Sequence, residues 1–278
     1  MTHQAKDPAL DFALRGIVFP PQPHLIAPIM AEMSKAEPDL KAIALLISGD
    51  VTLASSLLKM VNSPFYGLSR KVTSVEEAIV MVGIRKTLHM VRALSLSRSF
   101  KPMPGMEGFW EDTARNATFA LMLAGELGLD GDLSFLMGLF HDSGILLLMQ
   151  QQSDYLQVFR QSIESSDFSL ADLEYQCYNT DHARVGSVFA RYWYLPENIV
   201  RAIENHHSPD AFTAFTDREI GNLIAITVLA EDVNAEFLCQ PNFNWERMGQ
   251  AALSHLLVEA SAWPPLRADT VARFSKEL

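Results

Sequence analysis

The apolar residues of this chain recur mostly at spacings of three and four, and this helical periodicity constrains the fold more than any other feature. Near the N-terminus the pattern includes Leu25, Ile29, Met33, Leu40, Ile43, Leu46 and Ile47. No convincing series of residues alternates between apolar and polar, as a half-buried β-strand would require. The sequence therefore predicts an all-α fold made of many helices.

Two stretches interrupt the helical pattern. The stronger is KPMPGMEG, residues 101–108, which contains two prolines and two glycines, and the weaker is SPDAFTAFTD, residues 208–217. Within the N-terminal half, NSPFYG (62–67) ends a predicted helix over 51–61, and Ser74 with Glu77 forms a capping-box pattern that begins the next one. The last helical region is expected over roughly 245–278.

The charge balance argues against nucleic acid as a partner. With 33 acidic and 22 basic residues the formal net charge is −11, so the surface as a whole should repel a phosphate backbone. The densest basic positions are Arg85, Lys86, Arg92 and Arg98, and we interpret them as solvated helix faces.

The sequence also predicts a cytoplasmic protein that does not enter a membrane. The first residues, MTHQAKDPALDFALRG, lack the basic and apolar regions of a signal peptide, and the longest apolar runs are shorter than a bilayer requires. Cys177 and Cys239 belong to no metal-ligand spacing, and we expect both thiols to be unpaired.

The stretch GLFHDSGILLLM (138–149) places His141 and Asp142 side by side in an otherwise apolar run. A helix that is apolar on nearly every side is a buried helix. Burying a carboxylate without a partner is costly, so Asp142 should be paired, hydrogen-bonded or bound to a cation.

Three further histidines continue apolar helix faces in the same half of the chain. His182 begins a predicted helix, capped by Asp181 or Thr180, whose inward stripe also contains Val185, Phe189 and Tyr192. In PENIVRAIENHHSP the apolar spacing runs through Ile199, Val200 and Ile203 to His206 and His207. All three imidazoles should therefore point inward.

Two interpretations of these residues remain open. Imidazole and carboxylate together suit zinc, iron, nickel or manganese, and two neighbouring ions could form a hydrolytic centre. Alternatively, each histidine could be a core residue bonded to a backbone carbonyl, because lone inward histidines are common. We assign no role to His3, His24, His89 and His255.

This pattern resembles the HD superfamily of metal-dependent phosphohydrolases, and more closely its signalling branch, the HDOD domain. The resemblance covers about residues 17–212. It is carried in the N-terminal half by FPPQPHL, AIALLISGDVTLASSLLKMVNSPFYG and VTSVEEAIVMVGIRKTL, and in the C-terminal half by LFHDSGILLL, DHARVGSVFARYWYLPENIVRAIENHHSP and LAED.

The resemblance implies a multi-helix, HD-domain-like bundle with an N-terminal helical lobe. Residues 1–16 would form a lead-in and residues 17–212 the HDOD domain, composed of an N-terminal lobe (17–100) and an HD-like lobe (107–212). Residues 213–278 would then add C-terminal helices that complete the HD-like bundle.

The resemblance also implies a set of metal ligands. His141 and Asp142 match the HD pair, with Asp142 as the residue that would bridge two ions and the group to suspect first if the protein is an enzyme. The matched metal positions are His141, Asp142, His182, His206, His207, Asp112 and Glu231, with Asp232 as the neighbour of the last. One or two divalent transition-metal ions (Fe, Mn, Ni or Zn) would be the cofactor.

Two departures from the family pattern argue against catalysis. Asp112, in WEDT, stands where the superfamily usually has its first histidine ligand, which would change affinity and metal preference. Ile145 stands where phosphodiesterase relatives carry a lysine, which removes a cation that could hold a substrate phosphate. The glycine-tyrosine-proline loop of those relatives is absent as well.

Three functions therefore stay open. The one we favour is a regulatory output module that acts through signalling protein partners, without nucleic acid or membrane, and keeps a partly degenerate metal site. The others are a metal-dependent phosphohydrolase acting on a nucleotide or another phosphoester, and a metal or ligand sensor without turnover.

Overall fold

The structure is a computed structural model that describes residues 17–62, 68, 70–164 and 168–277. The described residues form helices and connecting loops with no β-strand, so the predicted all-α fold is confirmed. Contacts divide the chain into two compact units, one of Pro20–Pro102 and one of Met1–Phe19 with Met103–Leu278. The division falls at the edge of the proline- and glycine-containing segment 101–108. The finer domain ranges stay predictions.

The smaller unit contains five helices in chain order among its described residues. They are α2 (Ile26–Met33), α3 (Leu40–Ser48), α4 (Val51–Val61), α5 (Val75–Val82) and α6 (Ile84–Ser99). Asp39 and Asp50 cap α3 and α4 by accepting hydrogen bonds from backbone N–H groups of the first turn.

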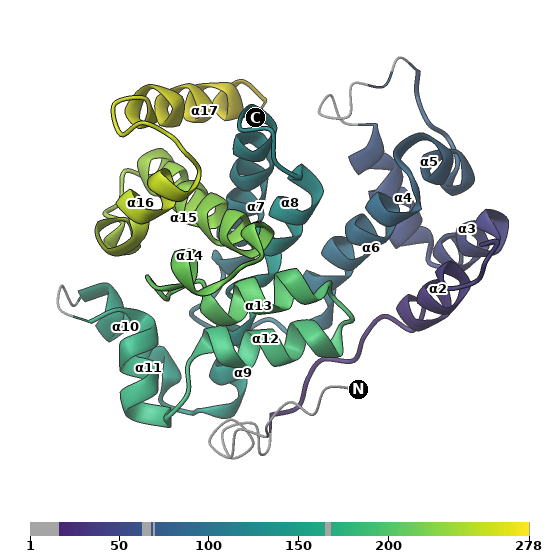
Figure 1. The fold of residues 1–278 in the computed structure, drawn as a ribbon. Helices are drawn as coiled ribbons and strands as arrows, with labels where there is room; N and C mark the ends of the chain where they lie inside the picture. Colours follow the sequence, from purple (N-terminus) through teal and green to yellow (C-terminus); the bar gives the residue numbers. More distant parts are fainter. Residues whose placement is uncertain (1–16, 63–67, 69, 165–167, 278) are drawn as a thin grey trace. The chain divides into compact units, whose positions relative to one another are not determined.

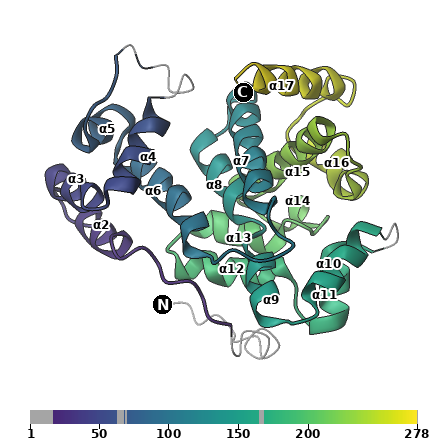
Figure 2. The same ribbon diagram turned by 180° about the vertical axis from the view of Figure 1, so that it is seen from behind.

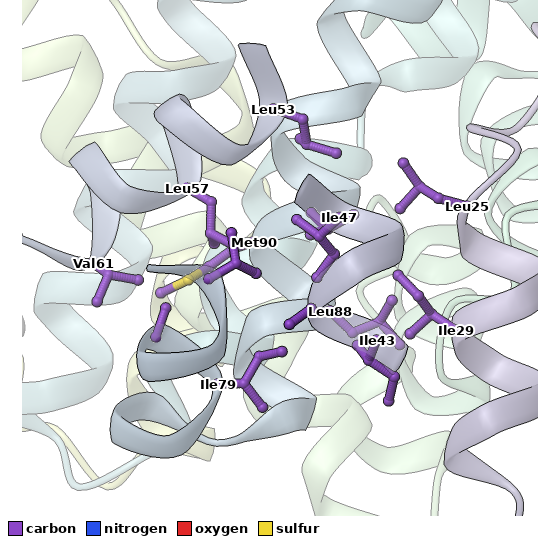
Figure 3. Close-up of a cluster of buried hydrophobic side chains, with 14 of the residues drawn as sticks. Leu25, Ile29, Ile43, Ile47, Leu53, Leu57, Val61, Ile79, Leu88 and Met90 are labelled. Carbon is purple, nitrogen blue, oxygen red and sulfur yellow. The ribbon is translucent and has the colours of Figure 1, made fainter. Parts of the chain in front are cut away.

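The core of this unit is the apolar face that the helical spacing predicted. Ile43 and Ile47 of α3 and Leu53 and Leu57 of α4 are at most 1% exposed, and their side chains turn toward one another with Met90 of α6 (Figure 3). Complete burial of each such side chain contributes roughly 1.5–3 kcal/mol. The turn predicted at 62–67 lies largely outside the described residues.

Two expectations for this unit need correction. The side-chain oxygen of Ser74 accepts from the backbone N–H of Glu77 (3.1 Å), but Glu77 accepts from the N–H of Thr73 (2.9 Å), so the predicted capping box is only half formed. Arg92 is not on a solvated face: it is 2% exposed, and burial lowers its pKa to about 10. Arg98 pairs with Asp50 at 3.2 Å.

The larger unit holds all the residues singled out for metal binding. Its helices are α7 (Phe109–Glu126), α8 (Gly131–Phe140), α9 (Ser143–Gln151), α10 (Tyr155–Glu164), α11 (Leu170–Tyr178), α12 (His182–Tyr192), α13 (Glu197–Asn205), α14 (Ala211–Ala214), α15 (Arg218–Leu238), α16 (Phe243–His255) and α17 (Trp263–Glu277).

Helix α15 is the central helix of this unit. It contacts α7, α8, α13, α16 and α17, and most of its residues from Ile220 to Asn234 are buried (Figures 1 and 2). Helices α12 and α13 lie side by side, with α9 beside α12 and the α10–α11 pair next to them (Figure 1). The site therefore forms where the ends of several helices meet around a buried framework.

The apolar run around the His-Asp pair is two helices rather than one. Helix α8 ends at Phe140 with His141 as its C-cap residue, and α9 begins after Asp142 as its N-cap residue. The break places both polar side chains at a helix junction, where backbone groups are free to bond outside the helix. Periodicity could not show this break because apolar residues continue on both sides of it.

Two glycines allow α9 and α12 to approach closely. A Cβ atom added to Gly144 would overlap the carbonyl oxygen of His182 and lie 2.8 Å from the backbone nitrogen of Gly186. Only a residue without a side chain leaves room for this contact. The approach brings Asp142, just before α9, next to His182, the first residue of α12.

By composition, the stretch Gly131–Gln151 is long and apolar enough to cross a membrane, contrary to the expectation that every apolar run is too short. Its tested window has a mean hydropathy of 1.3, but 78% of it is buried inside the fold, as in the core helix of many proteins. Helices α3 and α4 pass the same test only as a pair bent by 114°. The expectation of no membrane contact stays a prediction.

Replacing Gly144 with alanine should push α9 away from α12. Overpacking of this kind costs about 1–3 kcal/mol or more, because two backbones rather than two flexible side chains must move. We expect a lower midpoint in urea unfolding. The matched control is Gly125→Ala in α7, where nothing lies within 4 Å of the added Cβ. That change should be neutral or stabilise by up to about 1 kcal/mol, and equal effects of the two substitutions would contradict the close-approach explanation.

Candidate metal centre

Four of the predicted ligands meet in one cluster. One ligand atom from each of Asp142, His182, His206 and His207 lies within 4.8 Å of the others. Their side chains come from the N-cap of α9, the first turn of α12 and the residues that follow α13. The two adjacent histidines lie past the end of α13 rather than on its helical face, because the helix ends at Asn205.

The spacing of these atoms fits a single metal ion. Tetrahedral coordination with bonds of about 2.0–2.1 Å places neighbouring ligand atoms about 3.3 Å apart. Asp142 Oδ1 lies 3.5 Å from His182 Nε2 and 3.6 Å from His206 Nε2, and the Nε2 atoms of His182 and His207 are 2.8 Å apart. These separations bracket the expected value.

The orientation of two rings supports the same conclusion. Nδ1 of His206 lies 2.6 Å from the carbonyl oxygen of Ile203, and Nδ1 of His182 lies 2.6 Å from Oε2 of Glu174. Each ring therefore directs its Nε2 toward the cluster. Among the described residues the buried Nε2 of His206 has no hydrogen-bond partner, which is the state of a ligand atom that is ready for a cation.

His141 and Glu231 lie beside the cluster. Nε2 of His141 is 3.1 Å from Oδ2 of Asp142 and 3.4 Å from Oε1 of Glu231, whose other oxygen accepts from Asn244 at 2.6 Å. The neighbouring carboxylate, Asp232, instead accepts from the Trp263 indole and pairs with an arginine of α17. Of the two alternatives, Glu231 is the residue that faces the site.

Asp112 is not part of the four-residue cluster. It forms an ion pair with Arg115 three residues later, and its side chain is 49% exposed. Nε of Arg115 also donates to Oδ1 of Asn234 at 3.1 Å. A cationic side chain therefore already neutralises the group that replaces the family's first histidine ligand. The prediction that Asp112 binds metal is untested by these contacts.

The electrostatics of the metal-free site oppose one another. Burial by itself would raise the pKa of Asp142, but the neighbouring His141 holds it well below its usual range. Burial would lower the pKa of His182, yet the Glu174 carboxylate raises it to about 9. The pKa of His207 lies well below its usual value because of burial and the nearby imidazoles of His206 and His182. The cluster thus balances cations and anions among a few atoms.

Sequence reasoning missed Glu174, which is fully buried and bonded to His182. The signal available was weak, because a lone glutamate in LADLEYQCY looks like any surface residue of an amphipathic helix. The pattern also misplaced Tyr192, which is 46% exposed and stacks on Phe19, whereas Val185 and Phe189 of the same stripe are buried as predicted. Both predicted free cysteines are unpaired.

The sequence also did not reveal a cavity next to the cluster. It has a volume of about 690 Å³, and His207, Arg184, Arg247 and Tyr175 are among the residues that line it. The guanidinium of Arg184 lies over the Tyr175 ring, and Arg247 pairs with Asp172 at 2.9 Å. Two cations far apart in the sequence therefore line one opening beside a ligand histidine.

Comparison with known proteins identifies the family. The HDOD domain model matches residues 19–209, and the chain belongs to this family. An uncharacterized protein of Treponema pallidum (strain Nichols) is 27% identical over 193 residues, which are 68% of this chain and 37% of that protein. The chain thus spans about a third or less of the length of the curated relatives it matches.

Solved structures share the fold. The "Putative phosphohydrolase from Shewanella amazonensis SB2B" has a TM-score of 0.71 and 18% identity, covering 98% of each chain. A "Putative signal transduction protein from MARINOBACTER AQUAEOLEI VT8" has a TM-score of 0.70 and 19% identity, covering 97% of this chain and 63% of its own. At these identities the likeness establishes the all-helical architecture.

The raised pKa of His182 predicts how the stability of the metal-free protein depends on pH. Its folded pKa of about 9 exceeds the ordinary 6.5, so the stability it contributes is present below 6.5 and is lost as the pH rises through 9. The loss should reach up to about 3 kcal/mol. Urea unfolding with a chelator between these pH values measures it.

The control for this experiment is His182→Gln, which cannot gain or lose this proton. Its free energy of unfolding should fall less steeply over the same pH window. His141, whose pKa is also raised, would leave a residual slope in the variant. Identical slopes in the two proteins would show that His182 is not the titrating group.

Proposed function

We propose that this chain is a metal-binding regulatory module of the HDOD family that acts through protein partners rather than by catalysis. The observation that carries the metal-binding part is the convergence of four ligand atoms within 4.8 Å, one of them a buried Nε2 without a partner. A shared site explains this arrangement better than separate core histidines, because core histidines do not need to point at one another.

Asp142, His182, His206 and His207 would hold the ion. A divalent transition metal (Fe, Mn, Ni or Zn) bound there would supply positive charge and Lewis acidity. Three imidazoles with one carboxylate suit borderline metals of this kind better than Mg²⁺ or Ca²⁺, which prefer oxygen ligands. A second ion, held by His141, Glu231 and Asp112, is the less supported part, since Asp112 pairs with Arg115.

Two features support regulation over turnover. Ile145 is 4% exposed and contributes to the core, so the position at which hydrolase relatives carry lysine offers no group to a substrate. The pairing of Asp112 with Arg115 likewise removes a free anionic ligand. Protein partners, rather than nucleic acid, and a cytoplasmic location are part of the proposal, and the net charge of −11 supports the exclusion of nucleic acid.

A metal-dependent phosphohydrolase is the second candidate, and the cavity beside His207 favours it. Arg184 and Arg247 could contact a phosphate there, but each guanidinium lies within 3.5 Å of a carboxylate, Asp181 or Asp172. Glu204 adds a further negative charge to the lining. These carboxylates offset the attraction for an anion, and for this reason we place catalysis second.

Metal content tests the proposal directly. Protein purified without chelator and reconstituted with Zn²⁺ or Mn²⁺ should bind close to one equivalent, measured by elemental analysis after gel filtration. Asp142→Asn and His206→Gln should each weaken binding by at least about 10-fold, because each removes a ligand. Asp112→Asn should leave the stoichiometry unchanged.

The outcomes separate the alternatives. Wild-type protein that binds no metal would sink the metal-binding proposal. Two equivalents in wild type that fall to one in Asp112→Asn would establish the two-ion site and contradict the single-ion interpretation.

Turnover is tested on the same metal-loaded protein. We expect no hydrolysis of a generic phosphomonoester, a generic phosphodiester or cyclic dinucleotides beyond that of the Asp142→Asn variant. Metal-dependent hydrolysis that disappears in this variant would make the protein an enzyme and replace the regulatory proposal.

A further inference from the structure

A buried polar chain extends from His182 away from the metal ligands. Oε2 of Glu174 accepts from Nδ1 of His182 (2.6 Å) and from its backbone N–H (2.9 Å). Oε1 of the same carboxylate accepts from the Tyr155 hydroxyl. All three residues are at most 1% exposed. The proposed metal function does not by itself require Glu174 or Tyr155.

The carboxylate of Glu174 depends on these donors for its stability. A buried carboxylate with a missing donor costs several kcal/mol, so Glu174 holds its place only while the groups on both sides are in position. One side is His182 at the start of α12, and the other is Tyr155 at the start of α10. Glu174 itself lies in α11.

The state of the His182 ring connects Glu174 with metal binding. The Nε2 atoms of His182 and His207 are 2.8 Å apart, so without metal one of them must carry a proton. If a neutral His182 carries it on Nε2, then its Nδ1 presents a lone pair to Oε2 of Glu174 at 2.6 Å, which is repulsive. A metal on Nε2 removes that tautomer and leaves the proton on Nδ1, where Glu174 accepts it.

The α10–α11 pair is attached to the remainder of its unit through few elements. Its two helices contact each other, and beyond that they contact α9 and α12, as their position in Figure 1 shows. The aromatic ring of Tyr155 also stacks on Tyr178 of α11, whose hydroxyl donates to Asp154 at 3.1 Å. Within this pair, the buried bond from Tyr155 to Glu174 is the polar link to the metal site.

We propose that Glu174 and Tyr155 are positioning residues that couple metal occupancy to the docking of the α10–α11 pair. Metal binding fixes the His182 tautomer that Glu174 requires, Glu174 then holds the Tyr155 hydroxyl, and the two helices become more firmly docked. The inference rests on the proposed metal function and names the element that reports occupancy. α11 also lines the cavity beside His207, so occupancy would alter one wall of that cavity.

Hydrogen exchange measures the coupling in the full chain. Zn²⁺ should slow amide exchange in residues 155–163 and 170–178 by about 5-fold to 150-fold, the range of ordinary coupling free energies. Tyr155→Phe removes the hydroxyl that α10 contributes and should abolish most of this slowing in α10. Tyr178→Phe is the matched control: it removes a hydroxyl from the same pair that does not contact Glu174, and it should keep the slowing.

Glu174→Gln tests the positioning role. The amide is nearly isosteric and can still accept from His182, but it carries no charge, so Zn²⁺ affinity should fall by about 10-fold to 100-fold. The visible d–d bands of the Co²⁺-loaded variant should also shift, because the His182 ring is held differently. A role confined to folding would change unfolding stability but not this spectrum. Should Glu174→Gln fail to fold, the two tyrosine variants still test the proposal.

Failure of the coupling differs from failure of the metal function. If wild type binds no Zn²⁺, the metal function fails first. If wild type binds Zn²⁺ and loses it in His206→Gln, yet exchange in α10 and α11 is unaffected by metal, the coupling is overturned while the metal function stands. Equal behaviour of Tyr155→Phe and Tyr178→Phe would also overturn it.

Discussion

The close approach of α9 and α12 is the constraint on which the metal centre depends. Gly144 and Gly186 remove the side chains that would hold these helices apart, and the backbone of one helix then lies against the backbone of the other. Asp142 and His182 come within 3.5 Å because each begins one of these two helices. Interiors are close-packed and do not deform smoothly, so the helix separation sets the ligand separation.

Around this contact the molecule concentrates polar groups that would be costly elsewhere. His141, His182, His206 and Glu174 are all at most 1% exposed. Their cost is offset locally: backbone carbonyls accept from two of the rings, and Glu174 pairs with the third. The Nε2 atoms are thereby all directed to one place, which is the arrangement that metal coordination requires.

The sequence predicted the helical architecture and the convergence of inward histidines well, because both follow from periodicity. It predicted poorly wherever a helix ends. His206 and His207 follow α13 instead of lying on it, and His141 and Asp142 occupy a junction between two helices. Periodicity averages over several turns, so a break that keeps its apolar neighbours leaves no trace in the pattern.

Single charged residues were the other weak point. Arg92 is buried although it lies among basic residues, and Glu174 is buried although its neighbours look amphipathic. Whether a charge is solvated or paired depends on which helix packs over it, and this partner is distant in the sequence or lies across a helix break. The pairing of Asp112 with Arg115 is local, yet its effect on the metal site depends on where α7 lies relative to α15.

By itself the sequence determined the all-α fold, the apolar core faces and the residue types available for a metal site, because helix periodicity and ligand chemistry are local properties. Only the tertiary structure decided which of those residues meet. It brought four ligand atoms together, placed Asp112 in a separate ion pair and put Glu174 behind His182. The reason is that distances between helices arise from backbone packing at positions such as Gly144, and no pattern along a single helix contains that information.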